Sequence, residues 1–479
     1  MQTRPTKSDL RSRPLPALRI DAQGRRRVDD RALMSLAAPL FLNSGVQALL
    51  NLTDTWFLGR ISTDATAAVG AVYWFVIVLL LVLGGVGLAV QTLVAQAFGA
   101  GRRQEAAQAA WSGLWAALLM SPLFLLAGLG GAWLLRPFGL PPGVESLALE
   151  YWFPRMSGAT AGVALWAVSS FFNGIGRTGV TLALMLAVGL VNAVLNQVLA
   201  FGLDLGVAGI AWATTVAQVG GVLLGLGFFL GSRVHADYAS RLAWRPSPLE
   251  MRRALLLGLP MGLLPAADLV GMALFQLMQV GLGTVAGAAT QIVVMLTSLA
   301  YMPAVGIASA GTTLVGQSIG AGDRDWARKV GNAAIKVNLG YMGLVSLLLA
   351  AAGPWLLPLF VSASDPQAEA VVAMGRVLIW IAAAYQVFDG LNLGAAFALR
   401  GAGDVRLPAL LVVLVSWLGF VPLAHVLSFA PGAGWVGFLP QLGLGAAGGW
   451  AALLLYVVVL GSTMWLRWRS GAWRAIELH

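Results

Sequence analysis

Three carboxylates interrupt long apolar stretches of this 479-residue sequence: Asp54, Asp268 and Asp389. A charged side chain at the centre of a bilayer costs about 2.5–3.5 kcal/mol on insertion scales, so such residues usually mark an ion or substrate pathway. A carboxylate in such a place can hold a proton, a hard monovalent cation or a cationic organic molecule. We therefore take all three as candidate binding residues.

Asp54 belongs to a layer of oxygen-bearing residues in the first half of the chain. At about 1.5 Å per helical residue, Asp54 lies roughly 9 Å below the outer end of its predicted helix. Asn196 and Thr214 fall about 12 Å below the same surface, and Asn192 lies one turn deeper on the same face as Asn196. This set suits Na⁺ or a titrating proton. The alternatives are that Asp54 snorkels to the surface and that the asparagines only join helices.

Asp268 and Asp389 form a second candidate layer. They lie about 22 and 16 Å from the cytoplasmic ends of their helices, near the midplane, and Tyr385 is one turn from Asp389 on the same face. Two carboxylates close together out of water repel one another, which favours uptake of a proton or of a cationic ligand. The alternative is a purely structural role. His235 and His425 have no ligand spacing and are interpreted as structural.

The elements that position these residues are predicted to cross a membrane. The chain is 58% hydrophobic and 10% charged, whereas soluble domains carry about 25% charged residues. The fold class is an all-α polytopic membrane protein with twelve transmembrane helices. The apolar stretches long enough to span a bilayer are 32–58, 66–98, 106–135, 147–176, 179–203, 207–231, 253–282, 287–319, 329–361, 370–399, 405–428 and 440–466.

Positive charges set the predicted orientation. With the N-terminus inside, 25 of the 30 Lys and Arg residues fall in cytoplasmic segments, Arg400 among them, as the positive-inside rule requires. Both termini are therefore predicted to be cytoplasmic, and the first 31 residues lack the pattern of a cleavable signal. The net charge of +10 is explained by this orientation and does not indicate nucleic-acid binding.

A repeat divides the chain in two. "TLVAQAFGAG" (92–101) returns 221 positions later as "TLVGQSIGAG" (313–322), with seven of ten residues identical. Six spans separate the copies, so the two halves run in the same direction, as in transporters built from parallel repeats. The predicted parts are a basic tail (1–31), an N-lobe of helices 1–6 (32–231), a cytoplasmic linker (232–252), a C-lobe of helices 7–12 (253–468) and a second tail (469–479). The carboxylates do not repeat, since the same shift carries Asp54 to Phe275 and Asp389 to Val168.

The chain resembles the MATE family of multidrug and toxic-compound extrusion transporters over essentially all of residues 32–468. In the N-lobe the resemblance is carried by "LAAPLFLNSGVQALLNLTDTWFLGR", the repeat, "GLVNAVLNQVLAFG" and "GIAWATTVAQ". In the C-lobe, "LPMGLLPAADLVG", "YQVFDGLNLGAAFALRGAGD" and "SWLGFVPLAHVL" resemble the NorM branch of this family, within the MOP superfamily.

The resemblance implies a V-shaped antiporter of two six-helix lobes in a bacterial inner membrane. Such a protein exports organic, mostly cationic, drugs and other xenobiotics by alternating access, driven by inward Na⁺ or H⁺. The implied partners are small-molecule cations, the coupling ion and the lipid bilayer; we expect a monomer and no cofactor besides that ion.

The resemblance also assigns the candidate residues. Asp54 matches the first-helix acid of an N-lobe ion site, with Asn192, Asn196 and Thr214 as its polar partners. Asp268, Tyr385 and Asp389 match an acidic C-lobe site for ion and substrate; Na⁺ is the metal that either set would hold. In two departures from the pattern, some relatives have Asp where this chain has Asn196, and NorM-like proteins usually have Glu where Asp268 stands.

Two other functions were weighed. A lipid-linked oligosaccharide flippase of the same superfamily would need extra helices and a cationic cavity, whereas the candidate residues here are acidic. An intramembrane enzyme would need a nucleophile, a base or a metal constellation. The sequence has no Cys and only three scattered His residues, so we expect no enzyme.

Overall fold

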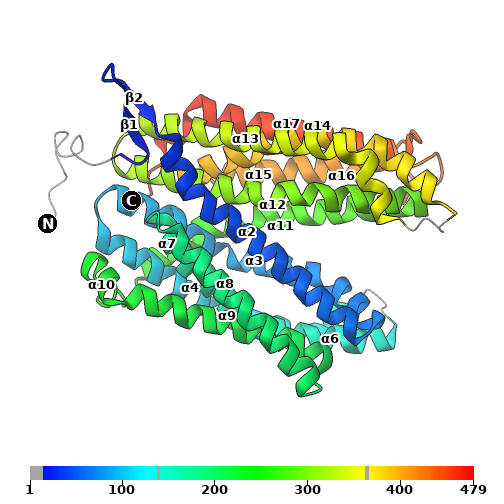
Figure 1. Ribbon diagram of the computed structural model, residues 1–479, viewed down its shortest axis with the longest axis horizontal. Helices are drawn as coiled ribbons and strands as arrows, with labels where there is room; N and C mark the ends of the chain where they lie inside the picture. The colour runs from blue at the N-terminus through cyan, green and yellow to red at the C-terminus, as the bar shows by residue number, and fades with distance from the viewer. Residues whose placement is uncertain (1–14, 137–140, 362–365, 479) are drawn as a thin grey trace.

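The computed structural model describes residues 15–136, 141–361 and 366–478. Within these residues the protein is almost entirely helical (Figure 1). The first 14 residues of the predicted basic tail and the last residue of the second tail lie outside the described residues.

Helices of the N-lobe (residues 32–231) and the linker come first in the chain. They are α2 (Asp30–Ile61), α3 (Thr63–Gly99), α4 (Arg103–Leu129), α5 (Gly131–Leu135), α6 (Pro142–Ser157), α7 (Ala159–Gly174), α8 (Thr178–Asn196), the π-helical η2 (Gln197–Gly202), α9 (Gly206–Leu230) and, in the linker, α10 (Ser232–Tyr238).

Helices of the C-lobe (residues 253–468) and its tail follow. They are α11 (Pro248–Gly281), α12 (Thr284–Gly320), α13 (Arg324–Leu356), η3 (Leu357–Phe360), α14 (Ala368–Gly401), α15 (Arg406–Leu414), the π-helical η4 (Val415–Phe420), α16 (Val421–Ser428), α17 (Gly445–Ser470) and η5 (Ala472–Ala475).

The predicted spans and the observed helices agree closely. Within the described residues, eleven helical segments are long and apolar enough to cross a membrane, and they coincide with eleven of the twelve predicted spans. The remaining span, 147–176, consists of α6 and α7, which meet at Gly158. Gly158 packs so tightly against Thr215 of α9 that a Cβ would collide with it, and the Thr215 hydroxyl donates to the Pro154 carbonyl at 2.9 Å. The fourth span is therefore a broken helix held to α9 at its break.

The helices of the two lobes form two adjoining groups. Figure 1 shows α11 to α17 side by side in the upper part of the view, α3 to α9 below them, and α2 running obliquely across the front. The lobes meet where α3 packs along α11 and α2 along α12. Each lobe has its own apolar core, around Trp152 and Phe124 in the N-lobe and around Trp450 and Leu378 in the C-lobe.

Large apolar side chains also cover the outside of the molecule. Leu126, Trp133 and Leu190 are examples, each more than 60% exposed. A soluble monomer rarely shows extended apolar patches, whereas lipid tails solvate them well. The protein is a multi-pass membrane protein.

Part of the predicted basic N-terminal tail is folded. β1 (Leu18–Ile20) pairs antiparallel with β2 (Arg26–Val28), and α2 begins directly afterwards at Asp30. The hairpin lies at the same end of the molecule as the C-terminal end of α17 (Figure 1); we call this end the termini end. The sequence analysis made no prediction of strands here, because it considered only the charge of this segment.

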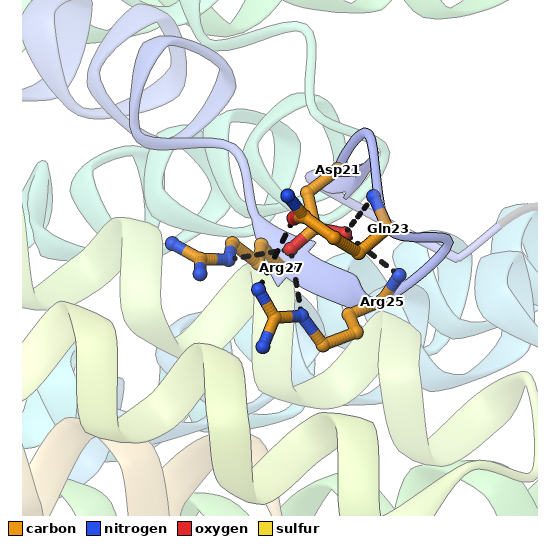
Figure 2. A network of polar contacts seen from close by, with 4 residues as sticks. All are labelled: Asp21, Gln23, Arg25 and Arg27. Atoms are coloured by element: carbon orange, nitrogen blue, oxygen red, sulfur yellow. Dashed lines mark hydrogen bonds and ion pairs between the residues drawn. The ribbon is translucent and has the colours of Figure 1, made fainter.

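One carboxylate holds the hairpin turn together. Figure 2 shows Asp21 accepting hydrogen bonds from the backbone of Gln23 and Arg25, at 3.0 and 2.8 Å, and from the guanidinium groups of Arg25 and Arg27. The backbone N–H of Arg25, with the help of these other donors, lowers the pKa of Asp21 from its ordinary value.

The hairpin fastens to the C-lobe although it leads into the N-lobe. Trp326 Nε1 of α13 donates to the Pro16 carbonyl at 2.9 Å. Arg26 forms an ion pair of 3.0 Å with Asp323, the N-cap residue of α13. The hairpin therefore connects the start of α2 to the start of α13 at the termini end.

Candidate functional site

The four N-lobe candidates form one hydrogen-bonded cluster. Asn196 Nδ2 donates to Asp54 Oδ1 at 2.7 Å, and Thr214 Oγ1 donates to Asp54 Oδ2 at 3.3 Å. Asn192 Nδ2 donates to Thr214 at 3.2 Å, and Asn192 Oδ1 accepts from Asn196 at 3.3 Å. Three helices, α2, α8 and α9, supply these side chains. The Asn196 Oδ1 atom is buried and has no hydrogen-bond partner among the described residues, so the cluster retains an oxygen that can bind a cation or a water molecule.

A buried arginine that the sequence analysis passed over lies beside this cluster. Arg155 on α6 is 7% exposed, and its Nε and Nη1 atoms have no hydrogen-bond partner among the described residues. Its charge interacts with that of Asp54, and the residue preceding it, Pro154, is bonded to Thr215, the neighbour of Thr214. Because a buried charge is costly unless compensated, Arg155 and Asp54 each reduce the cost of the other.

The two C-lobe carboxylates lie in one region but have separate partners. Tyr456 of α17 donates its hydroxyl to Asp268 Oδ1 at 2.7 Å, and Asn392 donates to Asp389 Oδ1 at 3.3 Å. The two carboxylates are near enough for their charges to interact. Asp389 is 9% exposed, so its charge is largely withdrawn from solvent, whereas Asp268 is half-buried and lines a cavity.

Tyr385 lies near this region without bonding either carboxylate. Its hydroxyl donates to Thr297 Oγ1 on α12 at 3.4 Å, and its ring lies 6.1 Å from that of Trp450. The sequence had suggested Tyr385 as the tyrosine beside a carboxylate, Asp389. The tyrosine that bonds a carboxylate is Tyr456, which donates to Asp268. A lone tyrosine in the last apolar span gave no signal of this contact, because the two residues are 188 positions apart.

A cavity of about 380 Å³ lies between the two lobes. Small-molecule sites in proteins are typically about 300–1,000 Å³, so this space fits a drug-sized ligand. Its N-lobe wall includes Gln91 and Asn173, and its C-lobe wall includes Asp268, Tyr301 and Asn392. Asp268 therefore connects the acidic region of the C-lobe to a space that both lobes enclose.

The two sequence repeats contact one another at the termini end of this cavity. Gln96 Nε2 donates to the Gly401 carbonyl at the end of α14, at 3.0 Å. Gln317 Nε2 donates to the Gly174 carbonyl at the end of α7, at 2.8 Å. Each repeat thus supplies a glutamine that satisfies an otherwise unpaired C-terminal carbonyl in the other lobe.

The glycines of the repeats make this contact close. A Cβ at Gly99 would collide with the backbone of Gln317, and a Cβ at Gly320 with the backbone of Gln96. Gln91, just before the first repeat, adds hydrogen bonds of 3.0 Å each to the Ser309 carbonyl and the Thr313 hydroxyl. The structure is therefore closed between the lobes at the termini end, and the repeated stretches form that closure.

Groups of three or more His, Cys, Asp or Glu residues that could hold a metal ion do not occur in the described part of the chain. The chemistry that the site offers is the binding of single cations, protons and charged organic groups by isolated carboxylates and amide oxygens.

A family model and curated relatives match this chain along most of its length. The MatE family model matches residues 39–198 and 260–447. The probable multidrug resistance protein NorM of Pseudomonas aeruginosa is 33% identical over 463 residues, covering 92% of this chain and 90% of the relative.

Solved structures share the fold. A crystal structure of MATE in complex with MaL6 superposes with a TM-score of 0.82 at 20% identity, covering 93% of this chain and 97% of that one. An outward-facing multidrug resistance MATE family transporter of the MOP superfamily superposes with a TM-score of 0.81 at 20% identity, covering 93% and 96%.

Proposed function

The chain belongs to the MatE family, and from that membership we propose that it is a cation-coupled antiporter that exports organic, mostly cationic, compounds across the bacterial inner membrane. The NorM relatives are named as multidrug resistance proteins, and with the MATE fold they support a multidrug efflux transporter. The coupling ion, the cationic class of the substrates and the alternating-access cycle are parts of our proposal.

The observation that carries the proposal is the inter-lobe cavity with a carboxylate in its wall. Asp268 lines the cavity, and the charge of Asp389 interacts with it from nearby. A cationic substrate and a coupling cation would compete for this negative charge. Such competition supplies the difference in affinity between states that any coupled switch requires.

The N-lobe cluster is the second place proposed for the coupling ion. Asp54 and the buried, unpartnered Oδ1 of Asn196 present oxygen atoms of the kind that Na⁺ prefers. A proton on Asp54 would be an equivalent occupant. Asn192 and Thr214 would hold these two side chains in place through the hydrogen bonds described above.

We propose that the termini end faces the cytoplasm and that this structure is outward-facing. Among the described residues, the basic hairpin, the basic start of α13 and the basic end of α17 lie at this end, as the positive-inside rule expects of a cytoplasmic face, and the repeats close the lobes there. One chain supplies both walls of the cavity, which supports a monomer as the transporting unit.

Efflux from proteoliposomes under imposed ion gradients tests the proposal. The purified protein is reconstituted, and export of a fluorescent organic cation is followed under a Na⁺ gradient and, separately, under an H⁺ gradient. We expect one of the two gradients to drive export at least tenfold faster than no gradient. Export that responds to neither gradient, or an absence of export, would contradict the proposal.

A further inference from the structure

The residues that follow α17 fold back onto the end of that helix. Gly471, the C-cap residue of α17, has a φ of 74°, in the left-handed region that favours glycine. Trp473 is buried and stacks on Trp468 with ring centroids 4.6 Å apart. Its Nε1 donates to the Trp468 carbonyl at 2.9 Å. We call residues 471–478 the strap.

Ion pairs hold the middle of the strap to the C-lobe. Arg474 Nη2 lies 2.7 Å from Asp325 Oδ1, and Arg324 Nη2 lies 3.6 Å from Glu477 Oε1. Arg324 and Asp325 belong to the first turn of α13, the helix start to which the N-terminal hairpin is also fastened. Exposed ion pairs contribute little stability, so the buried Trp473 is the main anchor of the strap and the ion pairs orient the residues beyond it.

Leu478 then reaches the line along which α3 packs on α11, which we call the seam. A Cβ at Gly403, in the turn after α14, would lie 2.8 Å from Leu478 Cδ1. Leu478 also lines a polar pocket with Leu93 and Gln96 of α3, and Gln96 is the residue that bonds the Gly401 carbonyl across the lobes. The apolar cluster against which Leu478 packs consists of Ala89, Leu257, Met261 and Val405.

Arg400 contacts the same stretch of α3 from the cavity side. It was counted among the cytoplasmic charges because it ends α14 one residue before the helix terminus, but its side chain reaches inward and lines the inter-lobe cavity. Its Nη2 donates to the Leu88 carbonyl of α3 at 2.9 Å. Arg400 therefore closes the seam from the cavity, whereas Leu478 closes it from the separate polar pocket.

Separation of the lobes would break the contact that Leu478 makes with the N-lobe. Trp473 and the ion pairs fix the strap to the C-lobe, whereas Leu93 and Ala89 would move away with α3. The apolar surface that these side chains bury together would be exposed, at a cost that grows with its area. The strap thus stabilises the arrangement in which the lobes are closed at the termini end.

We propose that the strap is a latch that holds the cavity closed at the termini end and so limits the entry of substrate from that side. The inference rests on the proposed function, in which the termini end opens to the cytoplasm in each cycle, and adds a regulatory element to it. Substrate arriving from that side binds only to the fraction of molecules that are open there, so the strap lowers the apparent affinity for substrate.

A cysteine placed inside the closure reports its opening directly. Ala95 of α3 is fully buried, and a Cβ at Gly316 of α12 would lie 2.8 Å from the Ala95 Cβ. Ala95→Cys should therefore react with a water-soluble maleimide only when the lobes separate. The labelling rate is measured in nanodiscs without substrate, in the Ala95→Cys protein and in the same protein with Leu478→Ala or Arg474→Gln. Leu466→Ala is the matched control, because Leu466 of α17 is 55% exposed.

We expect Leu478→Ala to raise the labelling rate about threefold or more, with unchanged gel-filtration behaviour. Arg474→Gln should raise the rate by less, because Trp473 still anchors the strap. Leu466→Ala should leave the rate unchanged. In proteoliposomes, the concentration of a fluorescent organic cation that gives half-maximal export should fall in Leu478→Ala by a factor similar to the rise in labelling rate.

Several results would overturn the inference. These are a labelling rate in both strap variants that is no higher than in the Ala95→Cys protein, and an equal rise in Leu466→Ala. Faster labelling of Leu478→Ala with an unchanged half-maximal concentration would also overturn it, because the strap would then not limit substrate entry. A wild-type protein that exports no organic cation would refute the proposed function, whereas normal export with unchanged labelling in both strap variants would refute only the latch.

Discussion

Asp389 combines deep burial with a single neutral hydrogen-bond donor. It is 9% exposed and accepts from Asn392 at 3.3 Å, while the charge of Asp268 repels it from nearby. Few groups in this environment favour its negative charge, so the residue is suited to take up a cation or a proton. An amide of the same shape would keep the packing and remove that capacity.

Asp389→Asn should therefore abolish efflux without unfolding the protein. We expect efflux of a fluorescent cation from cells to fall at least tenfold, with membrane expression and gel-filtration behaviour unchanged. Asp204→Asn is the control, because Asp204 is exposed in the turn before α9. Unimpaired efflux by Asp389→Asn would remove Asp389 from the site.

Arg155 offers a test of the N-lobe cluster. Its positive charge opposes the binding of a second cation beside Asp54. In Arg155→Gln that opposition is lost, so the ion concentration for half-maximal efflux, [Na⁺] or [H⁺], should fall by about threefold or more. Arg155→Lys should stay close to wild type. An unchanged half-maximal concentration in Arg155→Gln would indicate that the coupling ion does not bind at Asp54.

The sequence identified the acids of both sites and the neutral partners of Asp54, but not Tyr456 and Asn392 beside the C-lobe acids. Asp54, Asn192, Asn196 and Thr214 could be placed in one layer because helical rise converts residue number into depth. Arg155 is also a charged residue inside an apolar span. It was not selected, because the candidate layer was assembled only from residues with oxygen-bearing side chains. Arg400 was misplaced because its backbone is at the helix end while its long side chain reaches inward.

At the scale of elements, apolar length predicted the membrane spans well and predicted their interruptions poorly. The break at Gly158 lies within a continuous apolar stretch, and its cause is a contact with Thr215, which lies on another helix. The hairpin before α2 was also missed, because its stability depends on the turn around Asp21 and on contacts with Asp323 and Trp326, 297 and 310 positions from their partners.

The hairpin should loosen when Asp21 loses its charge. The pKa of Asp21 is lowered in the folded protein, so its contribution is present above the ordinary value of 3.8 and is lost as the pH falls through the lowered pKa. At pH 7, Asp21→Asn should speed hydrogen–deuterium exchange of residues 18–28 several-fold. Asp30→Asn, which changes a first-turn helix residue outside the turn, is the control. Equal exchange in wild type and Asp21→Asn would contradict this account of the turn.

At the scale of the whole molecule, the repeats and the carboxylates have different roles. The repeats are symmetric and form the closure, with Gln96 and Gln317 making equivalent bonds across the lobes. The carboxylates are asymmetric, with one in an amide-rich cluster of the N-lobe and two in the C-lobe. A duplicated scaffold can rock about a shared contact while its two halves bind different ligands.

If the lobes must separate at the termini end during each cycle, a covalent link there should stop transport. The chain has no Cys, so a disulfide can form only between two cysteines that are introduced. A Cβ at Gly316 of α12 would lie 2.8 Å from that of Ala95 of α3. Because disulfides place their Cβ atoms about 3.5–4.5 Å apart, Ala95→Cys with Gly316→Cys needs only a small shift to cross-link the lobes.

We expect oxidised Ala95→Cys/Gly316→Cys to export at least tenfold more slowly than the same protein after reduction. The matched control is Gly311→Cys with Ala334→Cys, which joins α12 to α13 inside the C-lobe, where the corresponding Cβ separation is 3.0 Å. This internal link leaves the lobes free to move relative to one another, so its oxidation should leave export within twofold. Continued export by a fully cross-linked Ala95→Cys/Gly316→Cys protein would show that transport does not open the contact between the repeats, and would refute alternating access through this end of the molecule.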